Sequence, residues 1–186
     1  MDLKLLKELC DCPGVPGCEN LVSEIVQREL KNYSEEITTD PMGNVIFKIT
    51  DNNGPRILVD AHMDEVGFIV SHIEENGIIR VIPLGGIDPK LFYGQRLTIW
   101  GKDEIDVTVG AIPPHIRKDT DSAPEIDDCI IDSGIEYKKL KKLVKVGDPV
   151  TFSTKCLVDN GRVLSKALDD RVGLFVAIEA IKSIKK

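Results

Sequence analysis

Two short motifs in the 186-residue chain combine residue types that suit metal chemistry, and the first contains His62 and Asp64. His62 and Asp64 directly follow the apolar run 57–61, whose pattern is typical of a strand buried on both faces. Ligand sites in α/β sheets lie at the carboxyl ends of strands, where an imidazole can bind an ion while a carboxylate holds the other ring nitrogen. Taken alone, the same pattern is more typical of a hydrogen-bonded structural histidine.

The second motif places two carboxylates, Asp169 and Asp170, directly before an apolar helix predicted over 171–184. A carboxylate that bridges two cations about 3.5–4 Å apart would help to create a hydroxide nucleophile and a clamp for a tetrahedral intermediate. An aspartate pair at a helix start is also a common N-cap, where negative charge is favourable. Each motif alone leaves both interpretations open, but their joint occurrence on either side of one β-rich stretch favours a shared metal site.

The segments that flank this stretch predict an α/β domain. Apolar residues at helical spacing indicate two helices near the N-terminus, and a change to strand-like patterns follows them. The predicted elements are helices over 2–12 and 19–32 and strands over 36–39, 45–49 and 57–61. We therefore expect residues 1–66 and 161–186 to form one partial catalytic-type α/β domain.

The stretch between the flanks predicts a β-rich insert domain over 67–160. Short β-like runs recur there, separated by turns that contain Gly, Asn and Pro, and one short helix is predicted over 136–143. Such a pattern is typical of a small antiparallel β-domain or barrel. The predicted strands are 68–73, 78–82, 96–100, 106–112, 129–132 and 149–153. The fold class expected from the whole pattern is α/β, interrupted by a small antiparallel β-barrel-like insert.

Composition excludes several function classes. The net charge is −7 and basic residues are not gathered in one long run, which argues against a nucleic-acid partner. No segment reaches the roughly 18 apolar residues of a membrane span, and the start Met-Asp-Leu-Lys lacks a signal-peptide pattern. We therefore expect a cytoplasmic protein without a membrane partner.

The five cysteines fit a reducing compartment, because they are odd in number and irregularly spaced. Cys10, Cys12 and Cys18 offer an alternative metal cluster. No Cys-x-x-Cys pair or nearby histidine completes that cluster, so we expect free thiols.

With these motifs in place, the chain resembles the TET (tetrahedral) aminopeptidases, co-catalytic metallopeptidases that assemble as hollow dodecamers and whose relatives carry glutamyl aminopeptidase or endoglucanase labels. The resemblance extends over essentially the whole chain. It rests on the segments Gly17-Cys18-Glu19, Asp40-Pro41-Met42-Gly43-Asn44, Ala61-His62-Met63-Asp64-Glu65-Val66-Gly67-Phe68, Gly85-Gly86-Ile87-Asp88-Pro89, Gly94-Gln95-Arg96, Pro113-Pro114-His115, Val146-Gly147-Asp148-Pro149-Val150 and Lys166-Ala167-Leu168-Asp169-Asp170-Arg171.

The resemblance implies a role for each matching position. His62 matches the family's first metal-ligand histidine, Asp64 the catalytic acid that orients it, and Asp169 the carboxylate that bridges two divalent metal ions, zinc or cobalt. It also implies peptide substrates, release of N-terminal residues by a two-metal hydrolytic mechanism, a cis bond between Asp169 and Asp170, and homo-oligomer contacts through the β-rich insert. His72 and His115 are interpreted as structural or surface histidines.

Family members are nearly twice as long as this chain, and the resemblance implies that a Glu-Glu pair, a further Asp and a late His are supplied by the part not present here. We therefore expect a truncated metallopeptidase-like domain that alone binds no metal ion or one weakly and turns over no peptide. A separately encoded C-terminal half is a candidate partner. A catalytically inactive truncated or assembly subunit is the alternative, and an endoglucanase is less favoured. The run 57–61 and the helix 171–184 would then expose apolar faces and a sheet edge.

Overall fold

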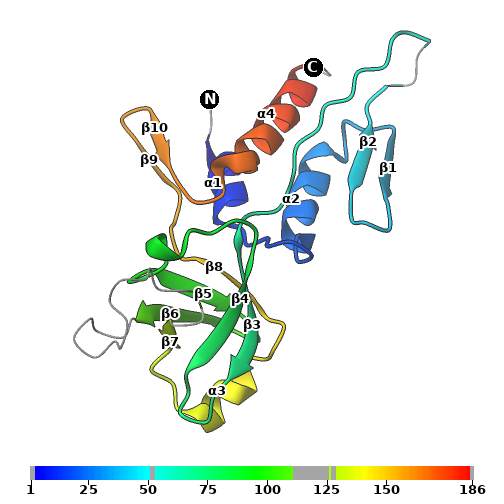
Figure 1. The fold of residues 1–186 in the computed structure, drawn as a ribbon. Coiled ribbons are helices and arrows are strands. Elements are labelled where there is room, and N and C mark those ends of the chain that lie inside the picture. Colours follow the sequence, from blue (N-terminus) through cyan, green and yellow to red (C-terminus); the bar gives the residue numbers. More distant parts are fainter. Residues whose placement is uncertain (1–2, 51–52, 111–125, 127–128, 185–186) are drawn as a thin grey trace. The chain divides into compact units, whose positions relative to one another are not determined.

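The computed structural model of the protein describes residues 3–50, 53–110, 126 and 129–184. The chain divides into two compact units. Unit 1 contains Met1–Gly14, Cys18–Asp64 and Lys155–Lys186, and unit 2 contains Val15–Gly17 and Glu65–Thr154. Figure 1 shows the elements of each. Among the described residues, no helix has both the length and the apolar character needed to cross a membrane.

Unit 1 is built on three helices: α1 (Lys4–Asp11), α2 (Asn20–Leu30) and α4 (Leu168–Ile184). Helix α4 packs against both α1 and α2 (Figure 1). Their apolar faces form one core, because residues spaced three and four apart point the same way on a helix. The fully or nearly buried members of this core are Leu6, Leu9, Cys10, Val22, Ile25, Val26, Leu30, Cys156, Leu174, Phe175 and Ile178. The three helices predicted from apolar spacing are therefore confirmed.

Two hairpins complete the regular structure of unit 1. Strand β1 (Glu36–Thr39) pairs antiparallel with β2 (Val45–Lys48), as the sequence predicted. Strand β9 (Leu157–Asp159) pairs with β10 (Arg162–Leu164), and this hairpin was not predicted. Its turn residues Asn160 and Gly161 have φ of 48° and 73°, the left-handed conformation that an Asn-Gly turn adopts readily. The Asn-Gly dipeptide was the signal in the sequence for this turn.

The strand predicted over 57–61 is wrong for this structure. Ile57, Leu58 and Val59 are 87%, 88% and 66% exposed, and the segment is a drawn-out connection between β2 and β3 (Figure 1). A strand needs a neighbour to bond its backbone, and no strand in the described part of the chain pairs with these residues. The expectation that apolar side chains would lie exposed here is confirmed, and Val172 and Val176 of α4 are also exposed.

Unit 2 is a closed antiparallel barrel with the strand order β3-β4-β7-β6-β5-β8, which confirms the predicted barrel-like insert fold. Its strands are β3 (Gly67–Ile73), β4 (Ile79–Leu84), β5 (Arg96–Trp100), β6 (Glu104–Gly110), β7 (Ile130–Asp132) and β8 (Pro149–Phe152). A short 3-10 helix, η1 (Pro89–Leu91), and helix α3 (Tyr137–Leu143) connect some of them. Closure leaves the sheet without a free edge.

The interior of the barrel is filled by alternate residues of its strands. In β6, Ile105, Val107 and Val109 are buried while the residues between them are exposed, which is the period-two pattern of a strand with one face on the core. Phe68 and Phe92 stack inside with ring centroids 4.6 Å apart. This core belongs to unit 2 alone and gives the barrel its own hydrophobic centre.

Candidate metal and peptidase site

The two motifs singled out in the sequence meet in unit 1. The Nδ1 atom of His62 lies 3.1 Å from an oxygen of Asp64, and its Nε2 atom lies 3.0 Å from an oxygen of Asp169. The fold thus joins residues 107 positions apart in the chain. His62 is held at both ring nitrogens by carboxylates, and the structure brings all three predicted site residues together.

The electrostatics of this triplet favour positive charge. Partial burial lowers the pKa of His62, but the hydrogen bond to Asp169 and the charges of both carboxylates outweigh it, so the pKa is raised above its usual value. The carboxylates therefore favour a cation at the imidazole, whether that cation is a proton or a metal ion. A raised pKa also means that a proton competes more strongly with a metal ion for Nε2 than it would at a free imidazole.

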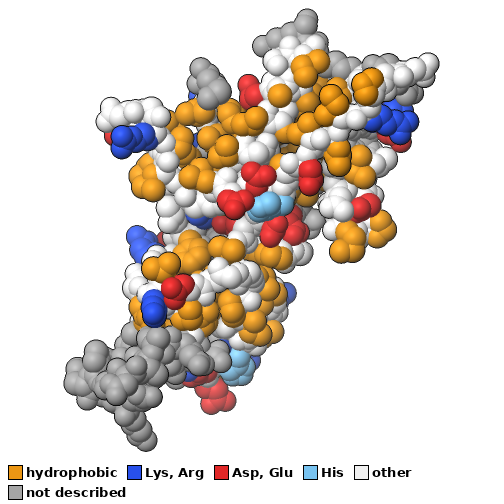
Figure 2. Space-filling view, turned by 45° about the horizontal axis from the view of Figure 1, so that its top comes forward, with side chains coloured by type: hydrophobic (Ala, Val, Ile, Leu, Met, Phe, Trp, Pro, Cys, Tyr) orange, Lys and Arg blue, Asp and Glu red, His pale blue; other side chains and the backbone are white. Residues whose placement is uncertain are grey.

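The site is open. The side chains of His62 and Asp64 are 52% and 41% exposed, and that of Asp169 is 96% exposed. Figure 2 shows acidic side chains gathered around a histidine on one face of the molecule. Water screens charges at this exposure, so the triplet alone is a weak electrostatic trap compared with a closed metal site.

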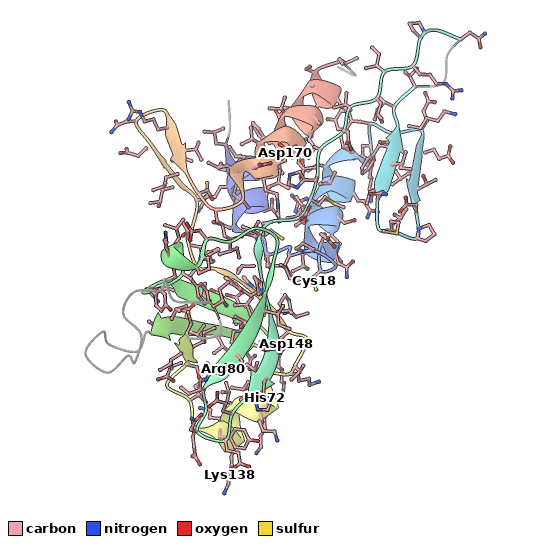
Figure 3. All side chains as sticks on the ribbon, in the orientation of Figure 1. Cys18, His72, Arg80, Lys138, Asp148 and Asp170 are labelled. Carbon is pink, nitrogen blue, oxygen red and sulfur yellow. The ribbon has the colours of Figure 1, made fainter. Side chains whose placement is uncertain are left out.

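The two neighbouring aspartates have different local roles. Asp170 lies at the start of α4 (Figure 3), and its carboxylate accepts a hydrogen bond of 3.0 Å from the backbone N–H of Gly173. That bond is an N-cap, so the capping interpretation is confirmed for Asp170. Asp169 instead directs its carboxylate to His62. The bond between the two residues is cis, as the resemblance implied.

The residue after the pair, Arg171, positions the start of α4. It is fully buried, and its Nη1 atom donates hydrogen bonds to the carbonyl oxygens of Leu9 at 2.6 Å and Cys12 at 3.3 Å. These carbonyls lie at the C-terminal end of α1, where the helix dipole favours a cation. A Cβ atom added to Gly14 would lie 2.7 Å from Arg171, so the glycine makes room for the guanidinium.

Arg171 belongs to the second motif, but its role could not be predicted from the sequence. Its signal was a lone cation in the first turn of an otherwise apolar helix, where only a paired charge is tolerated in a core. Through its bonds to α1, Arg171 fixes the turn that carries Asp169.

The described residues include no group of three or more His, Cys, Asp and Glu side chains arranged to hold a metal ion. The cysteine cluster considered from the sequence is therefore not formed, and all five cysteines are free thiols. His62 and Asp169 do fit as a pair of ligands. Metal–ligand bonds of about 2.0–2.2 Å at tetrahedral angles separate two donor atoms by about 3.3 Å, close to the 3.0 Å found between Nε2 and the Asp169 oxygen.

The other two histidines do not join this triplet. His72 is exposed on β3, in register with Arg80 of β4 (Figure 3). This placement agrees with its interpretation as a surface residue. His115 lies outside the described residues.

Comparison with known proteins places these observations in a family. The model of the M42 glutamyl aminopeptidase family matches residues 43–186. The chain is 32% identical over 192 aligned positions to the lysyl aminopeptidase of Pyrococcus furiosus, an alignment that covers 99% of this chain and 55% of that protein. The chain thus spans about half the length of the curated relatives it matches.

Solved structures give the same result. The TET aminopeptidase of the marine sediment archaeon Thaumarchaeota archaeon SCGC AB-539-E09 superposes with a TM-score of 0.91 at 36% identity, covering 98% of this chain and 54% of that one. The Pyrococcus horikoshii TET1 peptidase, which can assemble into a tetrahedron or a large octahedral shell, has a TM-score of 0.86 at 35% identity, with 98% and 56% covered. A Thermotoga maritima protein described as an endoglucanase has a TM-score of 0.82 at 35% identity, with 96% and 54% covered.

Proposed function

Because the chain belongs to the M42 glutamyl aminopeptidase family, we propose that it supplies the first part of a metal-dependent centre that releases N-terminal residues from peptides. The observation that carries this proposal is the position of His62 between Asp64 and Asp169. The lysyl aminopeptidase of Pyrococcus furiosus, which aligns along nearly the whole chain, supports the reaction class.

Each of the three side chains has a distinct part in the proposal. The Nε2 atom of His62 is a ligand for a divalent ion, zinc or cobalt, since both accept nitrogen and oxygen donors. Asp64 accepts the proton on Nδ1, which fixes the tautomer that leaves Nε2 free to ligate and raises its basicity. Asp169, with almost its whole side chain exposed, can contact a second ion while it shares the first with His62. When bound, the metal pair supplies Lewis-acid catalysis for amide hydrolysis.

A complete centre needs more donors than this triplet offers. A catalytic zinc ion normally takes three protein ligands, and His62 and Asp169 are two. We therefore expect the 186-residue chain to bind a single metal ion weakly and to hydrolyse no peptide. Turnover is expected only when a polypeptide that supplies the remaining ligands is present, either as a continuation of the chain or as a separate C-terminal half.

Metal titration tests the assignment of the ligands. Zn²⁺ or Co²⁺ is titrated into the apo chain by calorimetry, and His62→Ala and Asp169→Asn are each expected to abolish the weak binding event. Asp64→Asn should weaken it by about 10–100-fold, as expected for the partner of a ligating histidine. His72→Ala, a histidine of unit 2, is the matched control and should bind like the unaltered chain.

Two results would contradict the proposal. Metal binding that survives both His62→Ala and Asp169→Asn would remove the ligands from the site. Robust hydrolysis of an aminoacyl-nitroanilide by the purified 186-residue chain, abolished by His62→Ala, would show that the triplet needs no further donors. A chain that binds no metal and shows no turnover even with the remaining half would instead be an inactive assembly subunit.

Glycoside hydrolysis is a second candidate, favoured by the similarity to the protein described as an endoglucanase. It requires two carboxyl groups that face each other across an open space of about 5–9.5 Å. In this chain Asp64 and Asp169 both contact the ring of His62, which lies between them. We therefore rank this reaction below peptide hydrolysis.

We further propose that the protein is a cytoplasmic homo-oligomer. The ability of the similar Pyrococcus horikoshii TET1 peptidase to form closed shells supports self-association. Free thiols at all five cysteines are consistent with a reducing compartment. Light scattering at micromolar concentration checks the oligomer, and a monodisperse monomer would count against it.

A further inference from the structure

Segment 12–14, which directly follows α1, contacts both motifs of the candidate site although it contributes no ligand to it. Cys12 accepts hydrogen bonds from the second motif, and Gly14 packs closely against residues of both motifs. We propose that this segment is a positioning element that sets the distance between the two metal ligands, His62 and Asp169. The proposal rests on the metal site proposed above, and it adds residues that touch neither the metal nor the substrate.

The second motif is bonded to Cys12 at two points. The carbonyl oxygen of Cys12 accepts a hydrogen bond of 3.3 Å from Nη1 of Arg171 and a long one of 3.5 Å from Nζ of Lys166. Both cations lie at the C-terminal end of α1, where the helix dipole favours positive charge. Asp169 stands between Lys166 and Arg171 in the chain, so these bonds hold the turn that carries its carboxylate from both sides.

Gly14 provides the close approach between the motifs. It is buried, and a Cβ atom added to it would lie 2.7 Å from Nη2 of Arg171 and 3.0 Å from Cγ2 of Val22. The carbonyl oxygen of Met63, the central residue of the first motif, is 3.6 Å from the same position. The φ angle of Gly14 is not positive, so it is the lack of space, and not the backbone conformation, that requires a glycine here.

The guanidinium of Arg171 cannot move aside freely. It is fully buried, and its Nη1 atom is bonded to carbonyl oxygens of α1 and of segment 12–14. A methyl group at Gly14 must therefore displace either Arg171 or the segment itself, and each displacement moves one motif relative to the other. A metal site loses its productive geometry when its ligands shift by about 0.5 Å.

Crystal structures of metal-free variants measure this displacement. In Gly14→Ala, the separation between Nε2 of His62 and the Asp169 carboxylate should differ from the present 3.0 Å by more than about 0.5 Å. Gly86→Ala is the matched control, because no described atom lies within 4 Å of a Cβ atom added there. Val26→Ala removes buried methyl groups from the same core of unit 1 and should leave the separation unchanged.

Metal affinity provides a second measurement. In a Zn²⁺ titration, Gly14→Ala should weaken binding by at least about tenfold, as expected when a group that orients a ligand is disturbed. Arg171→Lys, which keeps a cation but loses the guanidinium fork, should weaken it by a similar factor and serves in place of Gly14→Ala if that variant does not fold. Adding Gly14→Ala to the Arg171→Lys chain should cause no further loss, because lysine places no atom at the position of Nη2.

The proposal is overturned if Gly14→Ala keeps both the separation and the Zn²⁺ affinity of the unaltered chain, or if Val26→Ala changes them as much. An equal loss of affinity from Gly14→Ala with and without Arg171→Lys would also overturn it. These outcomes leave the proposed function intact. Conversely, an unaltered chain that binds no Zn²⁺, together with the expected displacement in Gly14→Ala crystals, would refute the metal site and support the positioning element.

Discussion

At the scale of residues, the site depends on two adjacent aspartates that have the same side chain but different contacts. Asp169 contacts His62, whereas Asp170 caps α4 through the backbone N–H of Gly173. The residue pattern alone could not divide these roles, because ligation and capping both call for a carboxylate at a helix start, and only the family resemblance assigned ligation to Asp169. The difference lies in backbone direction: φ and ψ are −90° and 106° at Asp169 but −121° and 39° at Asp170.

The cap makes a prediction about Gly173. A Cβ atom added to Gly173 would lie 2.3 Å from a carboxylate oxygen of Asp170, which is a clash, so Gly173→Ala should displace the capping side chain. We expect a loss of about 0.5–2 kcal/mol in the free energy of unfolding, the usual cost of losing an N-cap. That loss opposes the gain of about 1 kcal/mol that alanine ordinarily brings inside a helix. Urea unfolding followed by circular dichroism measures the net change.

A double-mutant cycle isolates the cause. In the Asp170→Ala chain the carboxylate is gone, and Gly173→Ala should then be neutral or stabilising. Equal destabilisation by Gly173→Ala in both chains would show that the clash with Asp170 is not its origin.

At the scale of elements, most of the helices and the barrel could be predicted because their patterns are local. The period of 3.6 in α1, α2 and α4 and the alternation in β6 place apolar residues on one face, and each face found a core within the described chain. The β9–β10 hairpin was missed because its two strands are three residues each and mostly exposed, so alternation gives little signal. Only the Asn-Gly turn marked it.

The run 57–61 was predicted wrongly for a different reason. Its apolar residues predict burial on both faces, but burial requires neighbours that the pattern does not specify. A related limit holds for the site: the sequence predicted that Asp64 orients His62 and that Asp169 shares their metal site, but only the fold shows that one imidazole contacts both carboxylates directly. Arg171 could not be assigned a role because its partners are backbone carbonyls of α1, which carry no sequence signature.

The contact between α2 and α4 makes a prediction about pH. The Nζ atom of Lys182 lies 2.5 Å from a carboxylate oxygen of Glu29, and both side chains are about four-fifths buried. The hydrogen bond from Lys182 is the largest influence on Glu29 and holds the pKa of its carboxyl below the usual value. A carboxyl with a lowered pKa stabilises the fold above its unfolded pKa, and this stabilisation is lost as the pH falls through the folded pKa.

Lys182→Met should therefore cost about 1 kcal/mol of unfolding free energy at pH 7, and this cost should disappear in the acid range below the ordinary glutamate pKa. Burial lowers the pKa of Lys182, but its bond and attraction to Glu29 outweigh this and raise the pKa, so the pair also weakens only at strongly alkaline pH. Chemical unfolding at a series of pH values checks the profile. Lys138→Met, on α3 of unit 2, is the control, and an unchanged cost at low pH would contradict the assignment.

At the scale of the whole molecule, the chain contains two cores of different completeness. The barrel of unit 2 is closed and has its own apolar interior, whereas unit 1 exposes Ile57, Leu58 and Val59. A closed barrel has no unpaired strand edge that could associate with another chain, whereas the exposed apolar run of unit 1 has an unpaired backbone. We therefore expect the two units to have separate stabilities.

Two fully buried valines test this separation. Val15 belongs to unit 2 and Val22 to unit 1, and each is 0% exposed. Truncating either to alanine should cost about 1–3 kcal/mol by removing buried methyl groups. Amide hydrogen exchange should report the loss mainly in β3–β8 for Val15→Ala and mainly in α1, α2 and α4 for Val22→Ala. Equal loss of protection in both units from both variants would show one cooperative molecule instead.

The different roles of Asp169 and Asp170 also predict how the sequence would change in a lineage that no longer needed the catalytic site. The Asp169 side chain is almost wholly exposed, while Asp170 and Arg171 bond to the backbone of α4 and α1. A lineage kept only for its fold would lose little stability by replacing Asp169, whose contact is with the half-exposed His62, and more by replacing Asp170 or Arg171. Genetic drift would therefore replace Asp169 before Asp170 and Arg171. The identity of residue 169 among descendants would show whether catalysis was still under selection.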